Sequence, residues 1–200
     1  MPPRNVERRR SRVESQKGFP AKRPSPRPST LDSRLRRVRL LLCDVDGVLT
    51  NGLVFIGEGT EAKQFNIRDG LGLTMLRRAG IRVGWISSRP SAATAQRAAE
   101  LNIDFVHQER GSKVAAIEII LAQAGLTWAE VCYVGDDVVD LGALKRAGVG
   151  IAVADGVSEA RAAADYVTRA AGGRGAVREV VELVLKAQDK WSGLVAEYAA

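Results

Sequence analysis

The chain has 200 residues, of which 46% are hydrophobic and 26% charged, as is usual for a globular protein with one core. It contains no apolar run near the roughly 18 residues of a membrane span, and no apolar N-terminal stretch of the kind found in secretory signals. The formal net charge of +7 divides into +9 on residues 1–37 and −2 on the remainder. We therefore expect a cytoplasmic protein with a nearly neutral folded part and no membrane partner.

Residues 1–36 are predicted to form a disordered basic tail. Six of the seven prolines lie there among arginines and serines, and no apolar periodicity is present. Such an arm can bind nucleic acid, or it can be a solvated extension or the product of a misassigned start codon. We expect a solvated extension and no nucleic-acid partner. Residues 37–190 are predicted to form one domain, followed by a C-terminal tail at 191–200.

Strand-like and helix-like segments alternate from Val38 onward. The predicted strands cover residues 38–44, 81–87, 104–108, 131–136, 149–155 and 165–168. The predicted helices cover residues 70–80, 92–101, 113–125 and 176–190, with Asp69, Ser91 and Ser112 as caps of the first three, and residues 127–130 have the form of a capping box. Near-continuous apolar strands between helices predict an α/β fold, namely a three-layer Rossmann-like parallel sheet with helices on both faces. Residues 53–67 depart from the alternation and predict a β-hairpin with "GEG" at its turn.

Polar side chains stand where the predicted strands end or the next helix begins. They are Asp44, Asp46, Ser87, Lys113, Asp136 and Asp137. Because the carboxyl ends of parallel strands share one edge of a sheet, we expect these groups to converge. Each has a simpler interpretation when taken alone: "DVDG" suits a calcium loop that here lacks its later Glu, "GDD" suits a turn, and the serine or lysine suits a helix cap or a solvated charge. Their ordered occurrence at successive strand ends favours a functional site.

The chemistry of such a site follows from its charge. Several carboxylates can be ionised side by side only when a cation lies among them. Oxygen ligands without His or Cys nearby favour Mg²⁺. A dication, a lysine and a hydroxyl bind an anion, and the turn at Gly47 lets backbone N–H groups point at it. A carboxylate that faces a bound phosphoryl group can attack it to form an aspartyl-phosphate, while a second carboxylate transfers protons.

The stretches "DVDGVLT", "SSR", Lys113 and "GDDVVD" resemble the four motifs of the haloacid dehalogenase superfamily. The stretches "FNIRDGLG", "ADYVT" and "AGGRGAVREV" narrow the resemblance to its family of 3-deoxy-D-manno-octulosonate 8-phosphate phosphatases, over about residues 38–190. The resemblance implies that Asp44 is the nucleophile and a Mg²⁺ ligand. It implies that Asp46 is the general acid and base and binds the metal through its backbone carbonyl, and that Asp136 is the remaining protein ligand.

The same resemblance implies that Ser87 and Lys113 hold the transferring phosphoryl group, while Asp137 and Asp140 orient Lys113 and the metal-bound waters. One departure is visible, because the family usually has Thr-Gly-Arg where this chain has "SSR" at 87–89. Serine keeps the hydroxyl. Ser88, however, adds a Cβ at a turn that can need the freedom of glycine.

The implied substrate is a small sugar acid phosphate of lipopolysaccharide biosynthesis. Arg68, Arg89 and Arg174 are candidates for binding its carboxylate, since Arg binds carboxylates in a bidentate fork, and a plain surface charge is the alternative for each. Both positions where the superfamily inserts a cap domain are short here, so we expect a capless homotetramer in which a neighbouring subunit completes the site. Two alternatives stay open: a phosphatase of a nonulosonate 9-phosphate, and a non-catalytic binding module of the same fold.

The remaining distinctive residues are interpreted as structural. Cys43 and Cys132 lie in apolar strands and are expected to be buried free thiols. His107, the single histidine, ends a strand, and Trp85 and Tyr133 lie within apolar strands, where we expect them in the core.

Overall fold

The computed structural model of the chain describes residues 30–57 and 59–199, so the predicted tail is described only from residue 30 onward. The elements in chain order are α1 (Thr30–Leu35), β1 (Leu40–Asp44), β2 (Phe55–Gly57), β3 (Thr60–Ala62), α2 (Ile67–Arg78), β4 (Arg82–Ser87), α3 (Ala92–Glu100), β5 (Phe105–Gln108), α4 (Lys113–Ala124), η1 (Trp128–Glu130), β6 (Val131–Gly135), η2 (Val138–Asp140), α5 (Leu141–Arg146), β7 (Val149–Ala152), α6 (Ser158–Ala163), β8 (Tyr166–Val167), α7 (Ala176–Ala187) and α8 (Trp191–Ala196).

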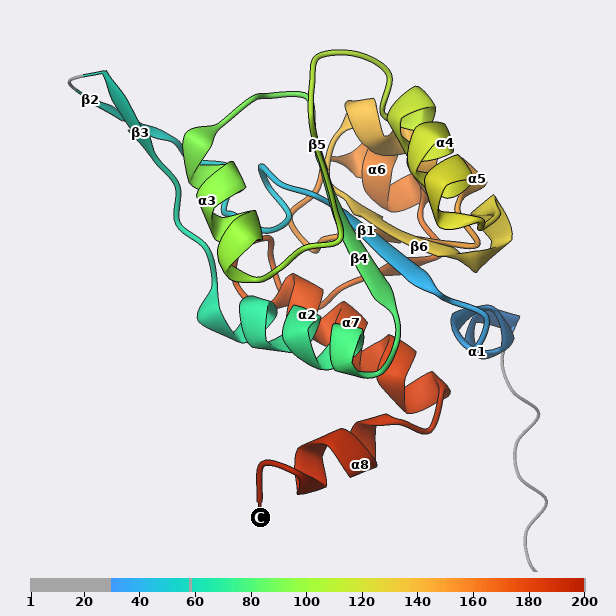
Figure 1. Cartoon of the computed structure of the whole chain (residues 1–200). Helices are drawn as coiled ribbons and strands as arrows, with labels where there is room; N and C mark the ends of the chain where they lie inside the picture. The colour runs from blue at the N-terminus through green and yellow to red at the C-terminus, as the bar shows by residue number, and fades with distance from the viewer. Residues whose placement is uncertain (1–29, 58, 200) are drawn as a thin grey trace, which may run out of the picture.

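Strand β1 lies in the middle of a six-stranded parallel sheet with the order β5-β4-β1-β6-β7-β8 (Figure 1). Successive side chains of a strand point to opposite faces. Leu41 and Cys43 accordingly pack into one core layer, and Leu40 and Leu42 pack into the other. Because both faces are covered, the run "LLLCD" is apolar up to its last residue, as the sequence predicted.

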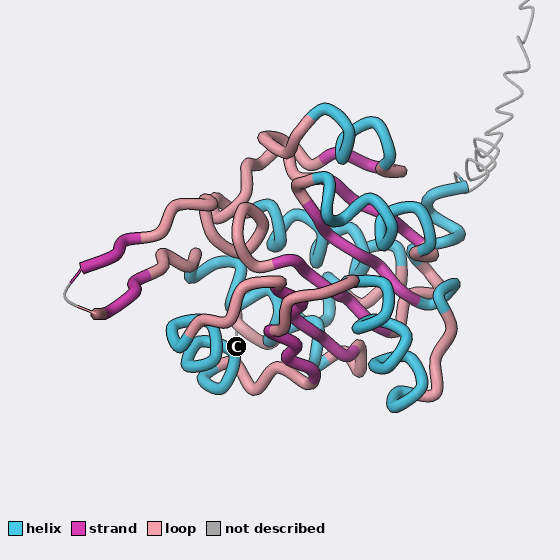
Figure 2. Tube along the Cα trace, turned by 90° about the horizontal axis from the view of Figure 1, so that it is seen from above, coloured by secondary structure: helices cyan, strands magenta, loops and turns pink. Residues whose placement is uncertain are grey.

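Helices cover both faces of the sheet. The layer that holds Leu41 is built from α1, α2, α3 and α7, and the layer that holds Leu40 is built from α4, α5 and α6. Figure 2 shows the strands between these helices, and both views show the β2–β3 hairpin projecting from the body. The predicted three-layer α/β fold is therefore confirmed. In the described residues, only the hairpin lies between β1 and α2, and only α3 and β5 lie between β4 and α4, so neither position holds a cap domain.

Two short helices extend the folded part beyond the predicted limits at residues 37 and 190. Helix α1 buries Leu35 in the core, and Arg34 donates two hydrogen bonds to the carboxylate of Asp165 at 2.6 and 2.7 Å. Helix α8 buries Leu194. Each helix has only six residues, which is too few for an apolar periodicity to indicate packing. Between residues 30 and 199, residue 58 apart, no helix has both the length and the apolar character needed to cross a bilayer.

The predicted helix caps are confirmed except for that of α2. Ser91 and Ser112 cap α3 and α4, and the capping box at 127–130 heads a short 3₁₀ helix. Helix α2 begins earlier than predicted, because Asn66 is its cap and accepts a hydrogen bond from the backbone of Arg68 at 2.8 Å. Asp69, predicted as this cap, is buried and accepts a hydrogen bond from the backbone N–H of Arg178 at 2.7 Å instead. It therefore caps the first turn of α7.

Candidate active site

Strands β1, β4 and β6 end at one edge of the sheet, where a cavity of about 240 Å³ opens. Its lining consists of Asp44, Asp46, Ser87, Ser88, Arg89, Lys113, Asp136, Asp137 and Val139. All six polar residues that the sequence placed at this edge thus meet in one cavity, together with one of the three predicted arginines. Their convergence follows from the parallel sheet, which brings together residues nearly a hundred positions apart.

Lys113 is the centre of the buried part of this site. Its Nζ lies 2.8 Å from Oδ1 of Asp44 and 2.6 Å from Oδ1 of Asp140, and all three side chains are nearly or fully buried. With Asp136, these residues form what we call the strand-end cluster. Three carboxylates around one ammonium leave the cluster with an excess of negative charge when all are ionised.

Asp140 accepts hydrogen bonds from four donors. Its Oδ1 accepts hydrogen bonds from Lys113 and, at 2.5 Å, from the hydroxyl of Tyr133. Its Oδ2 accepts from the backbone N–H groups of Asp136 and Asp137 at 3.0 and 3.1 Å. Tyr133 is in the core as predicted, but its hydroxyl also supports the site. Asp140 is thus a fully satisfied carboxylate that fixes Lys113.

Asp137 joins this network only through its backbone N–H. Its side chain is exposed and accepts a hydrogen bond from the backbone N–H of Val138 at 2.6 Å, which caps η2. Of the two residues expected to orient Lys113, it is Asp140 that contacts the ammonium in the described structure, while Asp137 lines the rim of the cavity.

The pKa values in the cluster show how crowded the negative charge is. Burial raises the pKa of Asp44 to about 6, although Lys113 opposes this shift. Burial, followed by the charges of Asp44 and Asp140, raises the pKa of Asp136 to about 8. Burial lowers the pKa of Lys113, but the two carboxylates beside it outweigh that effect, so its pKa is raised and the ammonium stays charged. The cluster therefore favours the arrival of a further cation.

The residues present fit a hard divalent cation. Asp44, Asp136 and Asp140 each offer a carboxylate oxygen within 4.8 Å of one another. Asp140 is already satisfied, whereas Oδ1 of Asp136 is buried and has no hydrogen-bond partner among the described residues. A side chain at Gly47, which has a φ of +91°, would place its Cβ 2.1 Å from Oδ2 of Asp136. Glycine therefore keeps this carboxylate accessible, and an all-oxygen donor set suits Mg²⁺.

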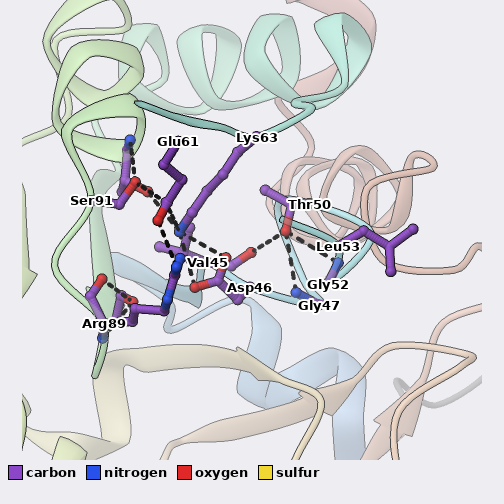
Figure 3. Close-up of polar contacts among 12 residues, drawn as sticks. Val45, Asp46, Gly47, Thr50, Gly52, Leu53, Glu61, Lys63, Arg89 and Ser91 are labelled. Atoms are coloured by element: carbon purple, nitrogen blue, oxygen red, sulfur yellow. Dashed lines mark hydrogen bonds and ion pairs between the residues drawn. The ribbon is translucent and has the colours of Figure 1, made fainter. Parts of the chain in front are cut away.

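Asp46 belongs to a second group of charges, the hairpin-base cluster, which also contains Glu61, Lys63, Arg89 and Ser91 (Figure 3). Nζ of Lys63 lies 2.8 Å from Oδ1 and 3.0 Å from Oδ2 of Asp46. Glu61 accepts a hydrogen bond from the hydroxyl of Ser91 at 2.7 Å and pairs with Arg89 at 2.6 Å. Lys63 and Glu61 were not predicted, because two charges after a hairpin turn form no recognisable pattern.

Ser87 ends β4 with its hydroxyl directed into a tight local turn. The hydroxyl accepts a hydrogen bond from the backbone N–H of Arg89 and donates one to its carbonyl, both at 3.0 Å. Ser88, where the family usually has glycine, does not have a positive φ, so its Cβ causes no backbone strain. The departure from the usual motif is therefore accommodated.

The three predicted arginines occupy two places. Arg89 lines the smaller cavity, whereas Arg68 and Arg174 line a second cavity of about 450 Å³. The loop that carries Arg174 lies directly against the loop after β1, because a Cβ on Gly172 would fall 1.7 Å from the carbonyl oxygen of Gly47. This contact requires glycine, and it explains the double glycine that precedes Arg174.

The chain matches known sequences over most of its length. The sequence profile of the haloacid dehalogenase-like hydrolases matches residues 83–180. The 3-deoxy-D-manno-octulosonate 8-phosphate phosphatase of Yersinia pestis is 42% identical over 161 residues, which cover 80% of this chain and 86% of the relative. That of Escherichia coli K12 is 42% identical over 159 residues, which cover 79% and 85%.

Solved structures agree with these relatives. The phosphatase of the same name from Moraxella catarrhalis, in complex with magnesium, phosphate and KDO, superposes with a TM-score of 0.82 at 39% identity, over 84% of this chain and 97% of that one. A cobalt-bound form from Haemophilus influenzae gives 0.77 at 39% identity, over 80% and 94%. The chain therefore belongs to the haloacid dehalogenase-like hydrolases and, within them, to the family of 3-deoxy-D-manno-octulosonate 8-phosphate phosphatases.

Proposed function

We propose that this chain is a Mg²⁺-dependent phosphatase that hydrolyses 3-deoxy-D-manno-octulosonate 8-phosphate to the free sugar acid and inorganic phosphate, a step of lipopolysaccharide biosynthesis. The observation that carries the proposal is a buried carboxylate, Asp44, 2.8 Å from a buried ammonium, Lys113, in a cavity at the sheet edge. This arrangement joins a nucleophile to a group that binds phosphate oxygens. The names of the relatives support the choice of substrate.

In the proposed reaction, a carboxylate oxygen of Asp44 attacks phosphorus, and the bond between phosphorus and the sugar oxygen breaks. Asp46 donates a proton to that leaving oxygen, and an aspartyl-phosphate remains. Asp46 then takes a proton from water, whose oxygen attacks the same phosphorus. Phosphate leaves and the Asp44 carboxylate is restored. Lys113 and Ser87 hold the non-bridging oxygens of the phosphoryl group during its transfer.

The residues around these groups orient them. Asp44, Asp136 and the backbone carbonyl of Asp46 would hold Mg²⁺, which when bound neutralises the charge of the phosphoryl group. Asp140 fixes Lys113 through the 2.6 Å ion pair. Asp137, at the rim, is proposed to orient waters there.

The substrate carboxylate is proposed to bind arginine. Arg89 lines the same cavity as the reacting groups. Arg68 and Arg174 both line the second cavity, beside the loop after β1. We propose that a sugar acid extends from the first cavity toward these two exposed guanidinium groups. Loss of either should raise the KM for the sugar acid phosphate more than the KM for an aryl phosphate, which has no carboxylate.

We further propose a cytoplasmic homotetramer in which the hairpin of one subunit covers the site of its neighbour. The hairpin exposes Phe55 by 65% and Ile56 by 79%, which is unusual for large apolar side chains unless a partner covers them. The catalytic domain is proposed to comprise residues 37–190 with α1 and α8 packed on it, and residues 1–29 to be dispensable. A fully active monomer in light scattering would contradict the tetramer, and a large loss of activity on deletion of residues 1–29 would contradict the last point.

A phosphate-release assay tests the function. The protein should release phosphate from 3-deoxy-D-manno-octulosonate 8-phosphate with Mg²⁺, faster than from a nonulosonate 9-phosphate, and EDTA should stop the reaction. A faster rate on the nonulosonate 9-phosphate would identify that compound as the substrate instead. A folded protein that releases phosphate from neither sugar phosphate would be a binding module rather than an enzyme.

A further inference from the structure

Lys63 is a buried charge that the proposed reaction leaves without a task. Its side chain is 0% exposed, although it follows directly on a hairpin whose other residues project from the body. Burying an ammonium so completely is unfavourable unless fixed partners surround it. The structure supplies them, because Lys63 lies among Asp46, Glu61 and the hydroxyl of Thr94, the last at 3.3 Å.

The contact with Asp46 is the closest of these. Nζ of Lys63 lies within 3.0 Å of both carboxylate oxygens of Asp46, at 2.8 and 3.0 Å. Oδ2 accepts a hydrogen bond from Nζ and Oδ1 lies at ion-pair distance from the same atom, so the ammonium restrains rotation of the carboxyl group. The side chain of Asp46 is 26% exposed, so it can turn toward water or toward the strand-end cluster once this restraint is removed.

The lysine is itself held on the side away from Asp46. Glu61 lies 3.7 Å from Nζ, and its carboxylate is fixed in turn by Ser91 and Arg89 (Figure 3). Ser91 caps α3, so the far end of this chain of contacts is anchored in a regular element. The ammonium is therefore a rigid support rather than a mobile surface charge.

We propose that Lys63 is a positioning residue, which holds the Asp46 carboxyl group in the orientation from which it gives a proton to the leaving oxygen and later takes one from water. This inference rests on the proposed function, in which Asp46 transfers both protons. It gives the base of the hairpin a part in catalysis within its own subunit, separate from any contact of the hairpin tip with a neighbour.

The two proton transfers can be tested separately, and this test distinguishes a positioning role of Lys63 from a merely structural one. An aryl phosphate such as p-nitrophenyl phosphate has a leaving group that needs no proton, so Asp44 can form the aspartyl-phosphate without Asp46. Hydrolysis of that intermediate still needs the base. In Lys63→Met we therefore expect a rapid burst of about one p-nitrophenolate per site, then turnover about 100-fold slower than in the wild type. With the sugar phosphate we expect no burst, a similar fall in kcat, and a KM within about threefold, since no binding contact is lost.

Four further variants make the result decisive. Asp46→Asn should show the same burst and slow turnover, and adding Lys63→Met to it should cause little further loss, because both act on one group. Lys63→Arg keeps the charge and should recover part of the rate. Lys145→Met removes an exposed lysine from α5 and should behave as the wild type.

Several outcomes would overturn the inference. These are unchanged turnover in Lys63→Met, a higher KM with kcat retained, which would make Lys63 a substrate ligand, or loss of the burst in a folded variant. Should Lys63→Met fail to fold, Thr94→Val keeps the lysine and removes one support, and it should show the same burst with a smaller fall in turnover. Wild-type activity on the sugar phosphate is measured alongside, so a failure of the proposed function appears in the wild type and a failure of this inference appears only in the ratio of variant to wild type.

Discussion

The site contains two aspartates, two residues apart, in opposite electrostatic surroundings. Asp44 lies in the strand-end cluster, where burial raises its pKa to about 6 and raises that of Asp136 to about 8. In the hairpin-base cluster, the pKa of Glu61 is lowered, first by its hydrogen bond from Ser91 and then by Arg89. The first cluster therefore disfavours its own negative charge, and the second stabilises it.

The difference shows how Asp44 and Asp46, two residues apart, can have different roles in one site. The strand-end cluster is short of positive charge and is completed by a cation and a phosphoryl group. The hairpin-base cluster already contains two cations, Lys63 and Arg89, for its two carboxylates. A ligand-dependent site thus lies beside a preformed one. Four changes, from the largest expected effect to the smallest, test this contrast.

Asp44→Asn should lower phosphate release by about 10⁴-fold or more, because the amide cannot attack phosphorus. The fold should be retained, since a neutral side chain replaces a carboxylate whose burial is unfavourable. Phosphate release and circular dichroism of the purified variant measure both. Asp189→Asn is the matched control: Asp189 is 77% exposed, has a positive φ that asparagine tolerates, and should keep full activity. Release above 1% of the wild-type rate by the Asp44 variant would exclude it as the nucleophile.

Asp140→Ala should reduce the free energy of unfolding by about 3–5 kcal/mol, because it leaves the buried Lys113 ammonium without its closest partner. Glu61→Ala removes a carboxylate that solvent reaches, and it should lower the free energy of unfolding much less. Urea unfolding of both variants in EDTA gives the two values. Equal losses would show that the two clusters do not differ in burial energy as described.

The stability of the metal-free protein should rise as the pH falls from 8 to 5. Asp44 and Asp136 have folded pKa values of about 6 and about 8, above the ordinary 3.8, so the folded state binds more protons than the unfolded state in this range. Integrated over this range, the two shifts correspond to at most about 5 kcal/mol, so the expected gain is a few kcal/mol. Urea midpoints at each pH in EDTA measure it. Adding Mg²⁺ should stabilise the protein most at pH 8 and flatten the slope, and a stability that instead falls toward pH 5 in EDTA would contradict the raised pKa values.

Gly172→Ala should destabilise the protein by about 1–3 kcal/mol, because its Cβ would overlap the carbonyl of Gly47 and displace the loop that joins the two clusters. Turnover should fall with both the sugar phosphate and the aryl phosphate, because Gly47 directly follows Asp46 and lies against Asp136. Gly193→Ala is the matched control, because a Cβ there meets nothing within 4 Å. Thermal melting of the two variants gives the difference, and identical melting temperatures would argue that the loops do not depend on this contact.

The strand-end cluster could be predicted from the sequence more fully than the hairpin-base cluster. Asp44 and Ser87 end buried strands and Asp136 directly follows one, and a parallel sheet leaves such residues only one edge at which to meet. Lys63 was missed because its burial depends on contacts with Asp46 and Thr94, 17 and 31 residues away, which no local pattern encodes. Asp69 was assigned to the wrong helix for a similar reason, since its partner Arg178 lies 109 residues away.

The central position of β1 has a consequence for synthesis on the ribosome. This strand emerges early, yet its neighbours β4 and β6 come later, and Asp136 follows directly on the second. At about 5–20 residues per second, the wait between Asp44 and Asp136 lasts roughly 5–20 s. During that time an apolar strand with two open edges needs protection from aggregation. The nascent chain also has no completed site until β6 is added, so it cannot consume sugar phosphates before the sheet has closed around its first strand.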